Sequence, residues 1–170
     1  ITLDLKSISS KKKNFANLNF NKLPNLMGVL NLTPDSFSDG GKFNTQNRGI
    51  KHAMEMYKSG ASIIDVGGES TRPGSKTLDK KLEWKRIHKI LKSICKKVPV
   101  SLDTRKSEIM EKGIKLGVKI INDVSGLNYD NNTIDILKKY KIPFVVQHAK
   151  DTTENMQRIP CYKNELLDIY

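Results

Sequence analysis

Five short apolar runs restrict the fold of this 170-residue chain more than any other feature of its sequence. Each run is rich in Val, Ile or Leu, is apolar at consecutive positions, and is followed by polar residues. Such runs are typical of parallel strands that are covered on both faces of a sheet. The sequence therefore predicts parallel strands within residues 26–32, 62–68, 98–104, 119–125 and 143–149.

Amphipathic segments separate these runs. Apolar residues recur at the spacing of one helix face in two segments that begin at Ile50 and Ile87. A third helix is predicted to begin at an N-cap formed by Ser107, and a fourth to carry Ile134. Glycines follow two of these helices, at positions 60 and 117, where a left-handed C-cap residue is expected. The repeated order of strand and helix predicts an α/β fold with a parallel sheet.

Polar residues stand at the carboxyl end of every predicted strand. They are Asn31, Thr33, Asp65, Asp103, Asn122, Asp123, Gln147 and His148. The carboxyl ends of parallel strands meet at one edge, which carries the chemistry in both barrels and open α/β sheets. No GxGxxG or GxxxxGK[ST] pattern follows a strand, so dinucleotide and P-loop sites are not indicated. A (β/α)8 barrel is favoured, although only five strands are present.

Two segments that follow strands are longer than the usual loops of about 2 to 6 residues in α/β units. They cover residues 33–46 and 69–78, and both are rich in Gly, Ser, Thr and Pro. Backbone N–H groups and hydroxyls in such loops can bind an anion. Arg72 adds a planar cation that suits phosphate oxygens. Both segments are therefore predicted to bind an anion, with solvated surface loops as the alternative.

The charge and the cysteines exclude several classes of protein. The chain carries 30 Lys and Arg against 18 Asp and Glu, a formal charge of +12. Because these basic residues are scattered, nucleic-acid binding is not expected, while attraction of an anionic small substrate stays open. Cys95 and Cys161 lie far apart, so neither a disulfide framework nor a zinc site is indicated. Without a membrane-spanning run or a secretory signal, a cytoplasmic protein is expected.

Four strings of residues carry a resemblance to a known family. They are NLTPDSFSDGG from residue 31, GASIIDVGGESTRPGS from residue 60, SLDTRKSEIMEKGIKLGVKIINDVSGL from residue 101, and the weaker QHAKDTTENMQ from residue 147. In order and spacing they resemble the signatures of the dihydropteroate synthases. The resemblance implies an α/β fold of the (β/α)8 TIM-barrel type, of which about the first five β/α units are present.

The resemblance also implies a reaction. The family condenses 6-hydroxymethyl-7,8-dihydropterin diphosphate with p-aminobenzoate, which yields 7,8-dihydropteroate and pyrophosphate in folate biosynthesis. It uses Mg2+, is the target of sulfonamides, and is expected to be a homodimer at full length. The pterin-binding barrels that methylate with methyltetrahydrofolate are an alternative, but they do not need a diphosphate loop. A non-catalytic remnant of a synthase is the other alternative.

Site residues are carried over from the family by position. Asp103, from the SLDT string, matches the carboxylate that holds the pterin ring, Asn122 matches the second pterin contact, and Asp123 is expected to share that pocket. Asn31 matches the residue at the Mg2+ and the diphosphate. Asp103, Arg72 and Asn31 are the expected catalytic residues. The diphosphate and p-aminobenzoate loops are expected to contribute Thr71, Arg72, Ser70, Pro73, Phe37 and Asp35.

Asp65 leaves alternatives open, and residues 147–149 depart from the family. Asp65 fits either a satisfied structural carboxylate or a site residue. The family usually has Met-His-Met where this chain has Gln147, His148 and Ala149, so its pterin pocket is expected to lack the two Met side chains.

The expected domain organisation has two parts. Residues 1–25 lack clear periodicity and are predicted to be a lead-in, either the end of an upstream domain or a hairpin under the barrel. Residues 26–170 are predicted to form part of a pterin-binding barrel. Members of the family continue through three more strand–helix units. An open half-barrel would expose sheet edges and an apolar interior, so the chain alone is expected to be inactive and poorly soluble.

Overall fold

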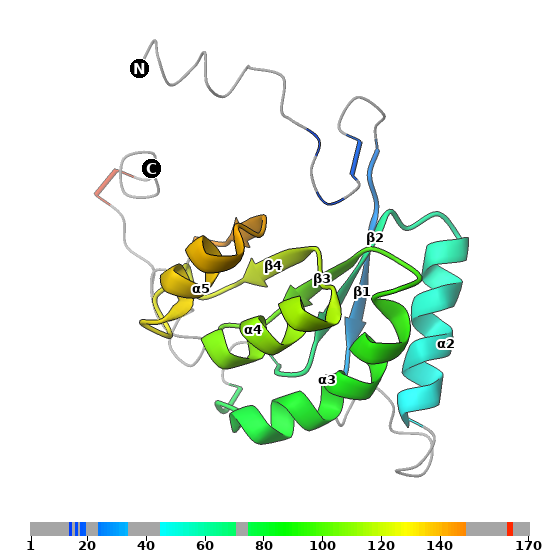
Figure 1. The fold of residues 1–170 in the computed structure, drawn as a ribbon, viewed down its shortest axis with the longest axis horizontal. Helices are drawn as coiled ribbons and strands as arrows, with labels where there is room; N and C mark the ends of the chain where they lie inside the picture. The colour runs from blue at the N-terminus through cyan, green and yellow to red at the C-terminus, as the bar shows by residue number, and fades with distance from the viewer. Residues whose placement is uncertain are drawn as a thin grey trace.

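The computed structural model describes residues 14, 16, 18, 19, 24–33, 45–70, 75–148, 163 and 164. Strands and helices alternate along these residues (Figure 1). The strands are β1 (Met27–Asn31), β2 (Ile63–Gly67), β3 (Val100–Asp103), β4 (Ile120–Asp123) and β5 (Phe144–Val146). The helices are α2 (Thr45–Lys58), α3 (Lys80–Ile94), α4 (Ser107–Leu116) and α5 (Thr133–Tyr140). All five strands lie within the predicted runs.

The strands form one parallel sheet in the order β1-β2-β3-β4-β5, the same order as in the sequence. Each helix follows one strand and precedes the next, so every connection is a strand–helix–strand crossover. A sheet whose strands keep their sequence order is the arrangement of the first units of a (β/α)8 barrel. The predicted fold class is therefore confirmed for the five units.

The helices cover one face of the sheet, and we call the opposite face the inner face (Figure 1). Alternate strand residues point to the two faces. Those on the helix side are buried in one continuous apolar core with residues of α3 and α4, which includes Leu30, Ile64, Val66, Val100, Leu102, Ile121, Ile87, Ile90, Ile94, Ile109 and Met110. Burial of these side chains drives the fold, since each fully buried aliphatic side chain contributes about 1.5–3 kcal/mol.

The inner face changes from apolar to polar along the strands. At its amino end, Leu18 packs against Ile63 and Ile120 in a second, small apolar cluster. Val29 and Met27 at the β1 edge are 54% and 43% exposed, because no described segment covers them. At the carboxyl end the residues are polar, and they form the candidate site.

Two of the helix ends follow the sequence predictions and one does not. Gly60 and Gly117 have φ values of 110° and 103°, so both adopt the predicted left-handed conformation. Ser107, however, does not cap α4, because it is the first helical residue and Lys106 occupies the N-cap position without a side-chain capping hydrogen bond. The Ser107 N–H instead donates to Asp130 Oδ2 at 2.9 Å. The cap comes from a residue 23 positions away, which a local pattern cannot reveal.

Candidate functional site

Four neighbouring strands place polar residues or glycine side by side at the carboxyl edge. Asn31 pairs in register with Gly67, Gly67 with Asp103, and Asp103 with Asn122. Register partners on adjacent parallel strands share one face, so these residues form a single row across the inner face. We call them the inner row. Three of the sequence-predicted residues, Asn31, Asp103 and Asn122, are thus brought together.

The absence of a side chain at Gly67 leaves space within the inner row. A Cβ added to Gly67 would lie 3.2 Å from Asp103 Oδ2 and 3.5 Å from Asn31 Oδ1. The two oxygens therefore approach the same point from the strands on either side. A cradle of this kind, lined by an amide oxygen and a carboxylate oxygen, can accept a cation or a hydrogen-bond donor.

Asp65 and Ser101 lie directly beneath the inner row, two residues earlier on β2 and β3, where they are register partners. Asn122 Nδ2 donates to Asp65 Oδ2 at 3.2 Å. Among the described residues, the other Asp65 oxygen, Oδ1, has no hydrogen-bond partner, and the same holds for Ser101 Oγ and Asp103 Oδ1. Buried polar atoms are normally paired. Three unpaired oxygens on one face indicate a place where a ligand supplies the missing hydrogen bonds.

The pKa shifts of Asp103 and Asp65 agree with ligand binding at the inner row. Burial raises the pKa of Asp103 to about 7, and the neighbouring Asp65 carboxylate adds to the effect. Burial also raises the pKa of Asp65, against the opposing effects of Ser101 and Asn122. A carboxylate that is desolvated and close to a second carboxylate is stabilised by a ligand with N–H donors or positive charge.

Asp123 lies beside the inner row without belonging to it. Its neighbour Asn122 points to the inner face, so alternation places Asp123 on the helix side. Asp123 Oδ1 accepts hydrogen bonds from the backbone N–H of Ser125 at 2.7 Å and from its hydroxyl at 2.6 Å. These contacts give Asp123 a role in the turn after β4. Its predicted share in the pterin pocket stays a prediction.

A second group of charges is buried at the same edge, and we call Glu69, Glu83, Arg105 and Lys106 the ion cluster. Arg105 donates to both oxygens of Glu69, at 3.0 and 3.2 Å. Lys106 Nζ lies 2.9 Å from Glu69 Oε2 and 2.5 Å from Glu83 Oε2, and Thr104 Oγ1 donates to Glu83 Oε1 at 2.6 Å. All four carboxylate oxygens are paired, as a buried ion cluster requires.

The ion cluster holds both ends of the second predicted loop. Glu69 is the first residue of that loop, and Glu69 Oε1 accepts a hydrogen bond from the backbone N–H of Leu78, the last residue of the loop, at 2.6 Å. Ser75 Oγ donates to the carbonyl oxygen of Ser70 at 2.6 Å, which closes the loop at its base. Burial alone would raise the pKa of Glu69, but the hydrogen bonds from Arg105, from the Leu78 N–H and from Lys106 lower it.

Several predicted site residues lie outside the described residues. They are Asp35, Phe37, Thr71, Arg72 and Pro73, so their roles stay predictions. Ala149 also lies outside them, while Gln147 and His148 are exposed after β5.

The ion cluster was not predicted from the sequence. One signal for it was present, because Glu83 occupies a position on the apolar face of α3 that includes Ile87, Ile90 and Ile94. An acidic residue in a stripe of that kind is buried only with a partner. The partners themselves could not be identified, since Glu69 and Arg105 come from two other segments of the chain.

The donor set at the inner row fits Mg2+ only in part. No cluster of three or more His, Cys, Asp or Glu side chains that could hold a metal occurs in the described part of the chain. Mg2+ usually keeps several waters and needs few protein oxygens, however. Asn31 Oδ1 beside Asp103 Oδ2 is compatible with such binding.

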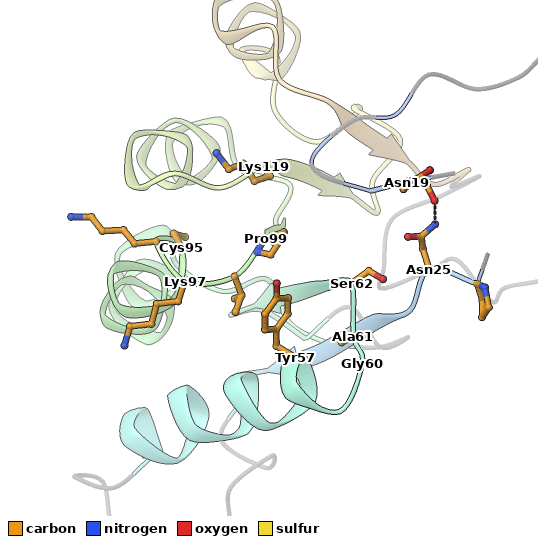
Figure 2. A pocket seen from close by; sticks show the side chains of 13 residues that line it. Asn19, Asn25, Tyr57, Gly60, Ala61, Ser62, Cys95, Lys97, Pro99 and Lys119 are labelled. Atoms are coloured by element: carbon orange, nitrogen blue, oxygen red, sulfur yellow. Dashed lines mark hydrogen bonds between the residues drawn. The ribbon is translucent and has the colours of Figure 1, made fainter. Parts of the chain in front are cut away.

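A hollow lies at the opposite, amino edge of the sheet (Figure 2). Its volume is about 1000 Å3, and Tyr57, Ser62, Cys95, Pro99 and Lys119 are among the residues that line it. The ammonium groups of Lys97 and Lys119 point away from the Tyr57 ring (Figure 2). None of the inner-row residues lines this hollow, so size alone does not identify the functional site here.

Comparisons with known proteins agree on one family. Residues 27–169 match the family described as "Pterin binding enzyme". The dihydropteroate synthase of Clostridium beijerinckii is 44% identical over 146 residues, which cover 85% of this chain and 52% of that protein. The chain thus spans about half the length of the curated relatives it matches.

Solved structures show the same similarity. The dihydropteroate synthase of Clostridium difficile, in the presence of pteroic acid, superposes with a TM-score of 0.80 at 38% identity, over 89% of this chain and 56% of that one. The enzyme of Anaplasma phagocytophilum, with bound 6-hydroxymethylpterin-monophosphate, gives a TM-score of 0.68 at 39% identity, over 75% and 49% of the two chains. No described helix is long and apolar enough to cross a membrane.

Proposed function

Because this chain belongs to the family of pterin binding enzymes, we propose that it binds a pterin at the inner row and serves the synthesis of dihydropteroate. In that reaction the C–O bond between the pterin methylene carbon and the diphosphate breaks, and the electron pair leaves with pyrophosphate. A C–N bond then forms to the amine of p-aminobenzoate, which loses a proton. The relatives that share the fold are named for this reaction.

One observation carries the proposal, namely the unpaired Asp103 Oδ1 in the inner row. A pterin ring presents N–H donors along its edge, and a carboxylate that only accepts hydrogen bonds complements them. Positive charge that develops on the ring as the diphosphate leaves is stabilised by the same carboxylate in its desolvated setting. Asp103 is therefore assigned the pterin ring, and Asn122 the second contact.

Asn31 is assigned to the diphosphate end of the site. Its Oδ1 shares the cradle over Gly67 with Asp103 Oδ2, so a cation held there would lie next to the pterin contact. When bound, Mg2+ supplies positive charge that neutralises the departing pyrophosphate. The chain's own residues orient the ring and exclude water, and the segment closed by Ser70 and Ser75 is assigned to the diphosphate and p-aminobenzoate.

The remaining expectations from the resemblance belong to this proposal. Thr71 and Arg72 would contact the diphosphate, while Phe37 and Pro73 would contact p-aminobenzoate. Asp35 would lie beside the metal or Arg72. Sulfonamide inhibition, a homodimer and a cytoplasmic setting are expected of the complete enzyme.

Thermal stabilisation by substrate tests the proposal without a need for turnover. The wild-type chain is heated with the pterin diphosphate, with and without Mg2+, beside Asp103→Asn and the control Asp135→Asn, an equivalent change on the exposed side of α5. We expect wild type and the control to be stabilised in a Mg2+-dependent manner, and Asp103→Asn not to respond. Stabilisation that does not depend on Mg2+ would indicate a pterin-binding protein of another chemistry. If the melting temperature of wild type did not rise with the pterin diphosphate, the proposal would be refuted.

A further inference from the structure

Asp65 has an environment that a purely structural carboxylate does not explain. The residue is only 5% exposed, and burial raises its pKa. Burial of a carboxylate is costly unless its oxygens are paired. Asp65 pairs one oxygen with Asn122 and leaves Oδ1 unpaired among the described residues, whereas the ion cluster at the same edge pairs every carboxylate oxygen.

The hydrogen bond to Asn122 has a direction. An amide group has a donor end and an acceptor end, and its neighbours decide which way it points. An ionised carboxylate can only accept, so Asp65 Oδ2 selects the NH2 end of Asn122, at 3.2 Å. The acceptor end, Oδ1, is then directed away from Asp65.

Ser101 completes the surroundings of Asp65. The residue is fully buried, is the register partner of Asp65, and lies beneath Asp103 on the same strand. Its hydroxyl is close enough to favour the ionised form of Asp65, yet it lacks a partner of good hydrogen-bond geometry within the described residues. The layer beneath the inner row therefore contains polar atoms, where an apolar barrel layer would normally pack.

We infer that Asp65 is a positioning residue, which holds the amide of Asn122 with its acceptor oxygen toward the bound molecule. Together with Ser101, it forms a polar floor under that molecule. The inference rests on the proposed function for the identity of the ligand, a planar heterocycle with N–H donors on its edge. Asp65 acts through Asn122, so its loss changes recognition of that edge while the fold remains.

Three variants separate positioning from a structural role. Asp65→Val removes both acceptor oxygens in a residue that suits a strand, and Asp65→Asn keeps one acceptor for Asn122. Asp135→Asn is the control. With 6-hydroxymethylpterin monophosphate as the probe in isothermal titration, we expect Asp65→Val to bind about tenfold more weakly or worse, and Asp65→Asn to stay within about threefold of wild type. Equal affinities for wild type and Asp65→Val would overturn the inference.

A second measurement needs no ligand and therefore separates a failure of this inference from a failure of the proposed function. The side-chain NH2 signals of Asn122 in a 15N spectrum, assigned through their absence in Asn122→Asp, report its hydrogen bond. We expect these signals to move in Asp65→Val and to stay near their wild-type positions in Asp65→Asn. Signals that do not respond to Asp65→Val would contradict the positioning role, even if wild type binds the probe.

If Asp65→Val does not fold, Asp65→Ser replaces it in both measurements. Serine stays polar, so it suits the floor, but it is too short to hold the Asn122 amide. The same weakened binding and the same movement of the Asn122 signals are expected. A Ser variant with wild-type affinity and unmoved signals would overturn the inference.

Discussion

The inner row and the ion cluster both have acidic side chains at the same edge of the same sheet, but the two groups differ in how their carboxylate oxygens are paired. In the ion cluster each carboxylate oxygen of Glu69 and Glu83 has a partner. Beneath and within the inner row, Asp65 and Asp103 each keep one buried oxygen without a partner among the described residues. Only one residue, Thr104, separates Asp103 from Arg105.

This difference distinguishes a structural role from a ligand-binding role. A buried charge cluster whose members are all paired adds little net stability, but it becomes very costly when one member is removed. An unpaired buried carboxylate is already destabilising, so its replacement by a neutral residue should not harm the fold. The ion cluster therefore ties the loop ends to the strands, whereas we propose that the inner row binds a ligand.

The largest expected effect comes from breaking the ion cluster. Lys106→Met leaves Glu83 and Glu69 buried with one cation for two carboxylates. We expect the free energy of unfolding to fall by about 3–5 kcal/mol, as when one partner of a buried ion pair is lost. Urea denaturation measures this change. A loss below about 1 kcal/mol, typical of exposed ion pairs, would show that the cluster is not structural.

The adjacent glycines give the next comparison, because Gly67 faces the inner row and Gly68 faces α3. A Cβ on Gly68 would lie 2.8 Å from Ile87 Cγ2 and 3.2 Å from the backbone oxygen of Glu83. Gly68→Ala should therefore lower the free energy of unfolding by about 1–3 kcal/mol.

Gly67→Ala is the matched change. Its methyl group would meet Asp103 Oδ2 at 3.2 Å and fill the cradle of the inner row. We expect a smaller loss of stability than for Gly68→Ala, together with weaker binding of 6-hydroxymethylpterin monophosphate. If Gly67→Ala and Gly68→Ala lowered the free energy of unfolding equally, and Gly67→Ala bound the pterin as wild type does, the two faces of the sheet would not differ in role.

The pH dependence of stability should have opposite signs in the two regions. Asp103 has a pKa of about 7 in the folded chain and an ordinary value of 3.8, so the folded state binds its proton more tightly. Its stabilising contribution is complete below about pH 4 and is lost as the pH rises through 7. Because the Asp103 side chain is partly exposed, we expect the free energy of unfolding to fall by about 1–2 kcal/mol over this pH range.

The contribution of Glu69 to stability should depend on pH in the opposite direction. Its pKa is lowered from 4.5, so its contribution is present above that value and is lost as the pH falls. Urea denaturation of wild type and Asp103→Asn at several pH values tests both signs. Asp103→Asn should reduce the loss of stability as the pH rises from 4 to 7, to which Asp65 also contributes, and should keep the loss in acid. An unchanged profile would contradict the assignment for Asp103.

The smallest effect is expected at an exposed pair. Lys139 Nζ lies 2.9 Å from Glu111 Oε1 on the surface of α5 and α4, and it lowers the pKa of Glu111 to about 2. Despite this shift, solvent screens the pair. Lys139→Met should leave the urea midpoint unchanged within error, and a clear decrease would mean that pairing alone, without burial, gives stability here.

The sequence predicted the framework because the framework depends on local patterns. All five strands fall within the apolar runs, and both C-cap glycines adopt positive φ. The neighbouring placement of Asn31, Asp103 and Asn122 was predictable because they end strands that share one edge. Features that depend on contacts between distant segments were not predictable. They include the Asp130 cap of α4 and the pairing of Glu69 with Arg105.

Asp65 shows the same limit within the site itself. Its position on a buried strand allowed either a structural or a functional carboxylate. The two alternatives differ in whether both Asp65 oxygens have hydrogen-bond partners. One partner is Asn122, which lies 57 residues further along the chain. The lack of a partner for Asp65 Oδ1 among the described residues could therefore be seen only in the folded structure.

The most direct test of the account measures binding and stability together on Asp103→Asn at pH 8. We predict that the wild-type chain binds 6-hydroxymethylpterin monophosphate, and that Asp103→Asn binds at least about tenfold more weakly while its free energy of unfolding is equal to or greater than that of wild type. An Asp103→Asn chain that loses stability as Lys106→Met does, or that binds the pterin as wild type does, would contradict the account. A wild-type chain that does not bind would contradict it as well.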